Sequence, residues 1–175
     1  TAQTEEWNAD FAYGVWVSGT SINSARRGLG SNGTYTSSLI YGGYESDYSG
    51  KTEIWNGSSW GELNDLNNGR NGNTGAGADS ASAITMGGYN TTLTYTGVTE
   101  SWNGTNWTEV NDLNTARSAA GGTGTSTAAI ATGGNTPPNF SDTKNESWNG
   151  TNWTEVNDLN TAREGANSSN AGIQT

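Results

Sequence analysis

The sequence predicts an all-β fold built from repeated four-stranded units, and three observations support this class. First, the phrase ESWNGTNWTEVNDLNTAR occupies residues 100–117 and returns unchanged at 146–163. Second, the arginine that closes the phrase recurs at steps of 44, 47 and 46 residues, as Arg26, Arg70, Arg117 and Arg163. Third, the chain is rich in Gly, Ser, Thr and Asn and has no stretch of helical periodicity, which favours short strands and tight turns. A unit copied this faithfully indicates a repeat architecture.

The composition restricts both the core and the chemistry. Only 30% of the 175 residues are hydrophobic and the net charge is -10, so eight tryptophans and seven tyrosines must supply much of the buried surface. The absence of cysteine and histidine excludes thiol chemistry, structural zinc and a histidine general base. Seventeen acidic residues against seven basic ones argue against nucleic-acid binding, which depends on cationic contacts to phosphate. No apolar run reaches the roughly 18 residues of a membrane span. We therefore expect no membrane insertion, and no residue pattern calls for a cofactor or a metal.

Each repeat is predicted to contain four consecutive strands. The first is rich in Gly, Ala and Thr and follows the arginine, and the second ends at a glycine pair. The third ends at a tryptophan, after which an Asn-Gly dipeptide that accepts positive φ leads through a tight hairpin into the fourth. The predicted second, third and fourth strands are 37–41, 51–55 and 60–63, then 82–86, 98–102 and 107–110, then 128–132, 144–148 and 153–156. The tryptophans that keep this register are Trp55, Trp60, Trp102, Trp107, Trp148 and Trp153.

A single four-stranded unit cannot bury both of its faces. If the units pack radially, each face covers its neighbour and the result is a β-propeller. The tryptophans then have a structural explanation, because they fill the wedge between neighbouring blades.

The order of these landmarks resembles the kelch repeat. That repeat has a glycine pair, an acidic-aromatic strand, a tryptophan about five residues later and a basic residue after the following loop. The resemblance covers essentially the whole chain and implies a kelch-like β-propeller, of the kind found in bacteriophage structural or fibre proteins and in bacterial surface proteins. The chain departs from the family in two ways: tyrosine follows the glycine pair in only two of three repeats, and tryptophan replaces the usual tyrosine on the third strand.

The repeat boundaries divide the chain into three complete blades and two partial ones. The complete blades are predicted at 23–66, 67–113 and 114–159. Residues 1–22 have the pattern of a third and a fourth strand, with a longer turn at 9–14, and residues 160–175 have that of the start of a next blade. Because the two ends together lack a Gly-Gly strand, we expect one propeller domain that is part of a longer chain or is completed by another chain.

The recurring arginines have two interpretations. They could form a ring of cations around an axial anion, or each guanidinium could hold its own loop through backbone carbonyls or a nearby carboxylate. The second is favoured because a planar group with five donors suits that task. The carboxylates considered for this role are Asp65, Asp112 and Asp158. Together with Asn64, Asn111 and Asn157 they could also ligate calcium, but no D-x-D-x-D-G loop is present and hydrogen bonding within the N-D-L-N turn is favoured.

The most variable segments, 44–50, 89–97 and 135–143, are predicted to lie at the same end of the blades as the N-D-L-N loops. The candidate ligand-binding residues in them are Tyr44, Asp47, Tyr48, Tyr89, Tyr95, Asn139 and Phe140. Aromatic rings among Asn, Asp, Ser and Thr are suited to stacking on a sugar and binding its hydroxyls, and loops on a rigid scaffold are where recognition usually resides. The alternative is that these aromatic side chains fold back on the blade edges.

The expected function is that of a non-enzymatic binding or structural module on a virion or an extracellular surface. The resemblance implies a fibre or surface appendage that presents its loops to a host glycan or protein, with other virion or surface-assembly proteins as partners. A purely structural spacer is the alternative. Enzyme activity is a third hypothesis. The copper oxidases built on kelch-like propellers need His and Cys, which are absent here. A glycosidase needs two carboxylates in contrasting environments, and the sequence does not single out such a pair.

Overall fold

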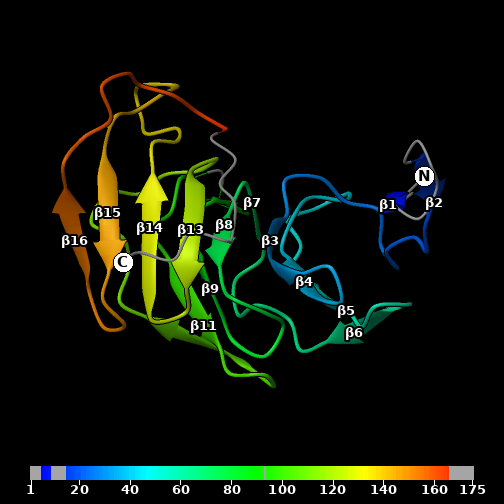
Figure 1. Ribbon diagram of the computed structural model, residues 1–175. Coiled ribbons are helices and arrows are strands. Elements are labelled where there is room, and N and C mark those ends of the chain that lie inside the picture. Colours follow the sequence, from blue (N-terminus) through cyan, green and yellow to red (C-terminus); the bar gives the residue numbers. More distant parts are fainter. Residues whose placement is uncertain (1–4, 9–14, 93, 166–175) are drawn as a thin grey trace.

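A computed structural model describes residues 5–8, 15–92 and 94–165. These residues form strands and contain no helix, which confirms the predicted all-β class. Most strands belong to three four-stranded antiparallel sheets, here called unit 1, unit 2 and unit 3, which follow one another from right to left in Figure 1. A two-stranded hairpin precedes unit 1 in the chain.

Each unit is a meander whose strands are paired in chain order. Unit 1 consists of β3 (Gly30–Thr34), β4 (Ser37–Tyr41), β5 (Thr52–Trp55) and β6 (Trp60–Leu63). Unit 2 consists of β8 (Thr74–Ala76), β9 (Ala83–Met86), β11 (Thr99–Trp102) and β12 (Trp107–Val110). Unit 3 consists of β13 (Gly121–Thr125), β14 (Ala128–Thr132), β15 (Asn145–Trp148) and β16 (Trp153–Val156). The second, third and fourth strands lie where the repeat predicts them, within one residue.

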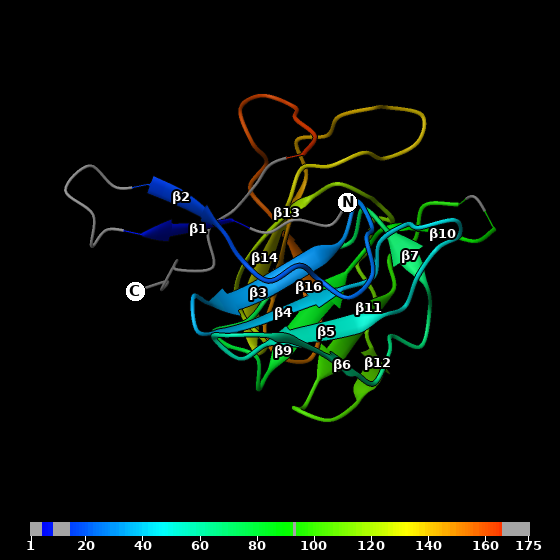
Figure 2. The ribbon, with the colours of Figure 1, turned by 90° about the vertical axis from the view of Figure 1, so that its right-hand side faces the viewer.

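The remaining strands form two small ribbons. The first pairs β1 (Glu5–Asn8) with β2 (Val15–Ser18), with Trp7 opposite Trp16. Trp55 lies opposite Trp60 in the same way, so the first ribbon has the register of a third and fourth strand. The second ribbon pairs β7 (Arg70–Asn71) with β10 (Tyr89–Asn90), which the sequence does not predict. In Figure 2 the two ribbons project to opposite sides of the units. The predicted turn at 9–14 lies outside the described residues, as does most of the predicted strand start at 160–175.

The hydrophobic core lies between the units. One cluster joins Leu39, Tyr41 and Leu66 of unit 1 and its following loop to Ala83, Trp102 and Trp107 of unit 2. A second cluster joins Ala76, Ile84, Met86 and Leu113 to Ala129, Ala131, Trp148 and Trp153 of unit 3. The tryptophans of units 2 and 3 therefore fill the spaces between units, as the repeat predicts.

Each fourth-strand tryptophan of units 2 and 3 also reaches back to the unit before it. Trp107 Nε1 donates a hydrogen bond to Thr52 Oγ1 at 3.0 Å, and the ring meets Tyr41 edge-on with centroids 4.8 Å apart. Trp153 Nε1 donates to Thr99 Oγ1 at 3.2 Å. A buried indole N–H needs such an acceptor, so the threonine that begins the third strand is part of the inter-unit contact.

The innermost strands approach closely because they are rich in glycine. A Cβ placed on Gly122 of β13 would lie 2.6 Å from the carbonyl oxygen of Gly75 on β8. No real side chain tolerates that separation, so the high glycine content of the first strands follows from the short distance between neighbouring units.

The outer hairpins use asparagine and glycine differently from the prediction. Gly57 has a φ of 93°, but Asn56 does not have a positive φ. Instead, Asn56 Oδ1 accepts hydrogen bonds from the backbone N of Ser58 at 2.9 Å and of Ser59 at 3.0 Å. The side chain thus closes an Asx turn inside a four-residue loop, and only the glycine needs left-handed backbone.

The variable loops lie at the same end of the units as the segments that lead into the next unit. Gly43 N donates to the carbonyl oxygen of Arg70 at 2.8 Å, and Gly88 N donates to that of Arg117 at 2.7 Å. The predicted strand polarity is confirmed, because the glycine pair after each second strand is bonded to the arginine that follows the fourth.

Candidate functional site

A buried arginine–glutamate pair joins each unit to the chain segment before it. The pairs are Arg26–Glu53, Arg70–Glu100 and Arg117–Glu146, and all six side chains are fully shielded from solvent. Arg70 Nη1 lies 2.7 Å from Glu100 Oε1, and Arg117 Nη2 lies 2.8 Å from Glu146 Oε1. Because desolvating each ion costs several kcal/mol, such a pair persists only with good geometry and additional hydrogen bonds.

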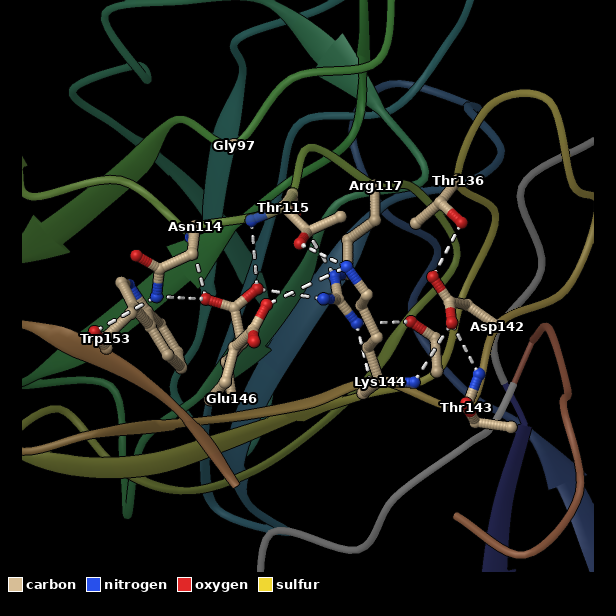
Figure 3. A network of polar contacts seen from close by, with 12 residues as sticks. Gly97, Asn114, Thr115, Arg117, Thr136, Asp142, Thr143, Lys144, Glu146 and Trp153 are labelled. Carbon is tan, nitrogen blue, oxygen red and sulfur yellow. Dashed lines mark hydrogen bonds and ion pairs between the residues drawn. The ribbon is translucent and has the colours of Figure 1, made fainter. Parts of the chain in front are cut away.

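Figure 3 shows these additional bonds around Arg117 and Glu146. Glu146 Oε2 accepts hydrogen bonds from the backbone N of Asn114 at 2.7 Å and from its Nδ2 at 2.9 Å. Arg117 Nη1 donates to the carbonyl oxygens of Gly133 at 2.9 Å and Lys144 at 2.8 Å. The pair therefore ties the loop after unit 2 to the second and third strands of unit 3.

The arginines make the kind of contact predicted for them, but the aspartates considered as partners have other roles. Asp65 Oδ1 accepts from the backbone N of Thr52 at 3.3 Å, and Asp112 Oδ1 accepts from that of Thr99 at 3.2 Å. Asp158 Oδ2 accepts from a threonine hydroxyl at 3.1 Å. These aspartates hold the loop after the fourth strand against the start of the third.

The glutamates are the functional residues that the sequence reasoning missed. Each stands two positions before the third-strand tryptophan and recurs with the arginine, and this joint recurrence of opposite charges is the signal that could have identified the pair. Since three of the recurring arginines are neutralised in this way, they do not form a ring of free cations.

The middle pair is the least completely bonded of the three. Within the described residues, Arg70 Nε and Nη2 are buried without a hydrogen-bond partner. Burial lowers the pKa of Arg70 below its ordinary value, and the neighbouring charge of Glu100 opposes that shift. The guanidiniums of Arg26 and Arg117, in contrast, each donate hydrogen bonds to two backbone carbonyl oxygens, one of a glycine and one of a lysine.

Arg163 differs from the other three landmark arginines because it is exposed. In the described part of the chain its side chain makes a single hydrogen bond, from Nε to the carbonyl oxygen of Thr161 at 3.5 Å.

Four of the predicted ligand-binding residues come together in a continuous row, here called the tyrosine row. Tyr44 and Tyr48 lie on the loop of unit 1, with ring centroids 5.3 Å apart. Tyr89 and Tyr95 lie on the corresponding loop of unit 2, with centroids 5.1 Å apart. Tyr48 and Tyr89 connect the two loops at 6.0 Å. All four side chains are half-buried, so the rings pack on one another and still reach the surface.

Charged and polar groups flank the row at its unit 1 end. The guanidinium of Arg27, a residue that the sequence reasoning did not single out, lies 4.8 Å from the centroid of Tyr44. Asp47 Oδ1 accepts a hydrogen bond from the backbone N of Tyr48 at 2.7 Å and so fixes the loop. Desolvation is the largest cause that raises the pKa of Tyr48, and the electrostatic influence of Tyr89, Tyr44 and Asp47 acts in the same direction.

Asn139 and Phe140 lie on the loop of unit 3, and none of their contacts within the described residues reaches the tyrosine row. Phe140 is 79% exposed, and Asn139 forms a backbone bridge with Thr136 of its own loop. Asp142 holds the end of this loop: its carboxylate accepts from Thr136 Oγ1 and from the backbone N of Thr143, both at 2.7 Å.

Two kinds of feature are missing from the described residues. No group of three or more acidic side chains there lies close enough to hold a metal ion. None of the secondary structure described is a helix of the length and apolar character that crossing a membrane requires.

The arrangement of strands is similar to that of a known structure, although sequence comparisons find no relative. No protein-family model and no curated protein matches the chain. The solved structure of YjhT superposes with a TM-score of 0.72 at 11% sequence identity, over 94% of this chain and 62% of that one. This similarity concerns the fold alone, and the chain spans less than two thirds of the YjhT chain.

Proposed function

We propose that the chain forms part of a kelch-like β-propeller and acts as a non-enzymatic recognition module that binds a host glycan through the tyrosine row. The propeller is supported by the repeat landmarks, by the meander topology and by a core that lies between the units. Placement on a virion fibre or another surface appendage rests on the kelch-like resemblance of the sequence.

The tyrosine row is the observation that carries the ligand proposal. Two neighbouring units bring four rings and one guanidinium to one end of the sheets. Such a surface offers ring faces for stacking and phenol hydroxyls for hydrogen bonds. A row of half-buried rings that extends over two units suits a chain of sugar residues better than a single small molecule, which binds preferentially in a concave pocket.

The buried carboxylates support a role without catalysis. Glu53, Glu100 and Glu146 are each paired with an arginine and shielded from solvent, so they are not available to exchange protons with a substrate. Catalysis of glycoside cleavage would need two accessible carboxyl groups facing each other across a bond.

A glycan array followed by titration of the best ligand tests the proposal. We expect Tyr48→Ala to weaken binding at least about tenfold, equivalent to about 1.4 kcal/mol, because Tyr48 links the two halves of the row. Tyr95→Ala should act in the same direction. The melting temperature of both variants should stay close to that of the wild type, since the rings are half-buried.

Tyr35→Ala is the matched control. Tyr35 is 69% exposed and lies between β3 and β4, at the other end of unit 1 from the tyrosine row. It should leave glycan binding unchanged. If no glycan binds, or if all three variants bind equally well, the recognition proposal fails and a structural spacer role takes its place.

A further inference from the structure

Arg27 carries a charge that no carboxylate of the described chain neutralises. The protein has seven basic residues and a net charge of -10, so carboxylates are abundant. Within the described residues, five of the seven basic side chains form an ion pair with a glutamate. Arg27 is not among them, and in the same part of the chain its guanidinium contacts the ring of Tyr44 without donating a hydrogen bond. Its charge and its N–H donors are therefore available to a ligand.

The fold does not require a cation at this position. The residue that follows the landmark arginine differs between the units, and in each unit its backbone pairs with the residue that follows the glycine pair. The three pairs are Arg27 with Tyr44, Asn71 with Tyr89, and Ser118 with Asn135. Since asparagine and serine form the same backbone bridge, the charge of Arg27 has no structural task that the repeat demands.

Arg27 stands at one end of the tyrosine row and makes this end different from the other. Its guanidinium lies 4.8 Å from the ring centroid of Tyr44, and the row continues through Tyr48 to Tyr89. At the unit 2 end the equivalent residue is the uncharged Asn71 of β7, opposite Tyr89 of β10 in the ribbon at the right of Figure 2. A guanidinium stacked on a ring uses its flat face and keeps the donors of its edge for another partner.

The acidic residues near this end have other contacts. Glu45 forms an ion pair with Lys51, whose Nζ lies 3.0 Å from Oε1. Asp47 is exposed, and its Oδ1 accepts a hydrogen bond from the backbone N of Tyr48 at 2.7 Å. Among the described residues neither carboxylate is ion-paired with Arg27, so the row retains a cation at its unit 1 end.

We infer that the tyrosine row binds an acidic glycan, in which the carboxylate of one sugar pairs with Arg27 while neighbouring sugar rings stack on the tyrosines. This inference rests on the glycan recognition proposed above and adds the class of sugar. A carboxylate is planar and accepts two parallel hydrogen bonds from a guanidinium edge, which a neutral sugar does not offer. Because the cation lies at one end only, it also sets the direction in which the glycan chain lies along the row.

Calorimetric titration with two matched glycans tests the inference. Oligogalacturonate carries a carboxylate on each sugar, and its fully methyl-esterified form has the same length and the same rings without the charge. The wild type should bind the acid at least about tenfold more tightly than the ester, equivalent to about 1.4 kcal/mol. Added salt should weaken binding of the acid and leave binding of the ester unchanged, because salt screens an exposed charge pair.

Substitutions of Arg27 assign the effect to this side chain. Arg27→Gln should lower the affinity for oligogalacturonate at least tenfold and leave that for the ester unchanged. Arg27→Lys should give an intermediate loss, because it keeps the charge but not the planar fork. Arg163→Gln is the matched control: it removes the same charge from an exposed arginine of another unit and should change neither affinity. Thermal melting of each variant verifies that it is folded.

The outcomes separate this inference from the recognition proposal. If the acid and the ester bind equally well and Tyr48→Ala weakens both, the row recognises glycans but Arg27 does not select acidic ones, and the inference is overturned. The same holds if Arg27→Gln and Arg163→Gln lower the affinity for the acid equally, because the effect is then one of net charge. If neither glycan binds, the inference fails, and the glycan array decides separately whether the row recognises other sugars.

Discussion

The interfaces between units and the loop end with the tyrosine row are built from the same repeat but follow opposite rules. At the interfaces the same residue types return in each unit, and the arginines, glutamates and third-strand tryptophans are buried. At the loop end the residues differ from unit to unit, and the tyrosines there are only half-buried. Unit 3 has Asn135 and Phe140 in a loop where units 1 and 2 have tyrosines.

This difference separates what holds the fold from what can recognise a ligand. Repetition is required where one unit must fit the next, since each interface repeats the same geometry. A loop that touches only solvent and its neighbours is free of that requirement, so its residues can be adapted to a partner.

Truncation of an interface tryptophan should have the largest effect. Trp102 is 1% exposed in the core between units 1 and 2, and Trp102→Ala should lower the free energy of unfolding by about 3 to 5 kcal/mol, as for other buried large aromatics. Chemical denaturation measures this, with Tyr35→Ala as a surface control expected to stay within about 0.5 kcal/mol. An unchanged transition for Trp102→Ala would place that side chain at the surface and not in the core between units 1 and 2.

Removing one charge of a buried arginine–glutamate pair should have the second-largest effect on the free energy of unfolding. Glu146→Gln keeps the shape of the side chain but leaves Arg117 buried without a counter-charge, so we expect a loss of about 3 kcal/mol in the free energy of unfolding. Glu155 lies opposite Glu146 on β16 and is 58% exposed, which makes Glu155→Gln a matched control with an expected loss below about 1 kcal/mol. Equal losses for the two variants would show that burial of the pair has no energetic consequence.

The smallest effect should appear at the loop of unit 3 on acidification. Burial by itself would raise the pKa of Asp142, but hydrogen bonds from Thr136 and from the backbone N–H groups of Lys144 and Thr143 outweigh it, so the pKa lies below the ordinary value of an aspartate. A carboxyl with a lowered pKa in the folded state contributes stability above its unfolded pKa and loses that contribution as the pH falls through the folded value.

We therefore expect the amide resonances of Thr143 and Lys144 to titrate at a lower pH than an ordinary aspartate does in the wild type, and not to titrate in Asp142→Asn. Because Asp142 is partly exposed, the associated change in stability should stay below about 1 kcal/mol. A midpoint at or above the ordinary pKa of an aspartate would contradict the bonding seen around this carboxylate.

The strands were predictable because the sequence repeats its landmarks. A tryptophan, an Asn-Gly dipeptide and a glycine pair recur in register, and each marks a strand end that depends mainly on local backbone preferences. The β7–β10 ribbon carries no such marker. It forms because Asn71 and Tyr89 are brought side by side by neighbouring elements, and only the folded chain contains that proximity.

The candidate site was predictable in part. Tyrosines on variable loops could be singled out by type and position, and the common end of those loops followed from strand polarity. Their assembly into one row could not be foreseen, because the contact between Tyr48 and Tyr89 depends on the distance between two units. For the same reason Arg27 was overlooked, since its place above Tyr44 results from the pairing of their backbones.

The all-β class, the repeat and its strands follow from the sequence alone, because composition, turn residues and recurrence can be read along the chain. The tertiary structure decided which charges pair, which rings meet and which donors are left without an acceptor, because these depend on how one unit lies against the next. Asp65 and Glu53 are both acidic residues of the same repeat, yet only Glu53 reaches the buried guanidinium of Arg26. The three-dimensional positions of the side chains therefore determine which carboxylate pairs with the arginine, because a desolvated charge is stable only beside its counter-charge.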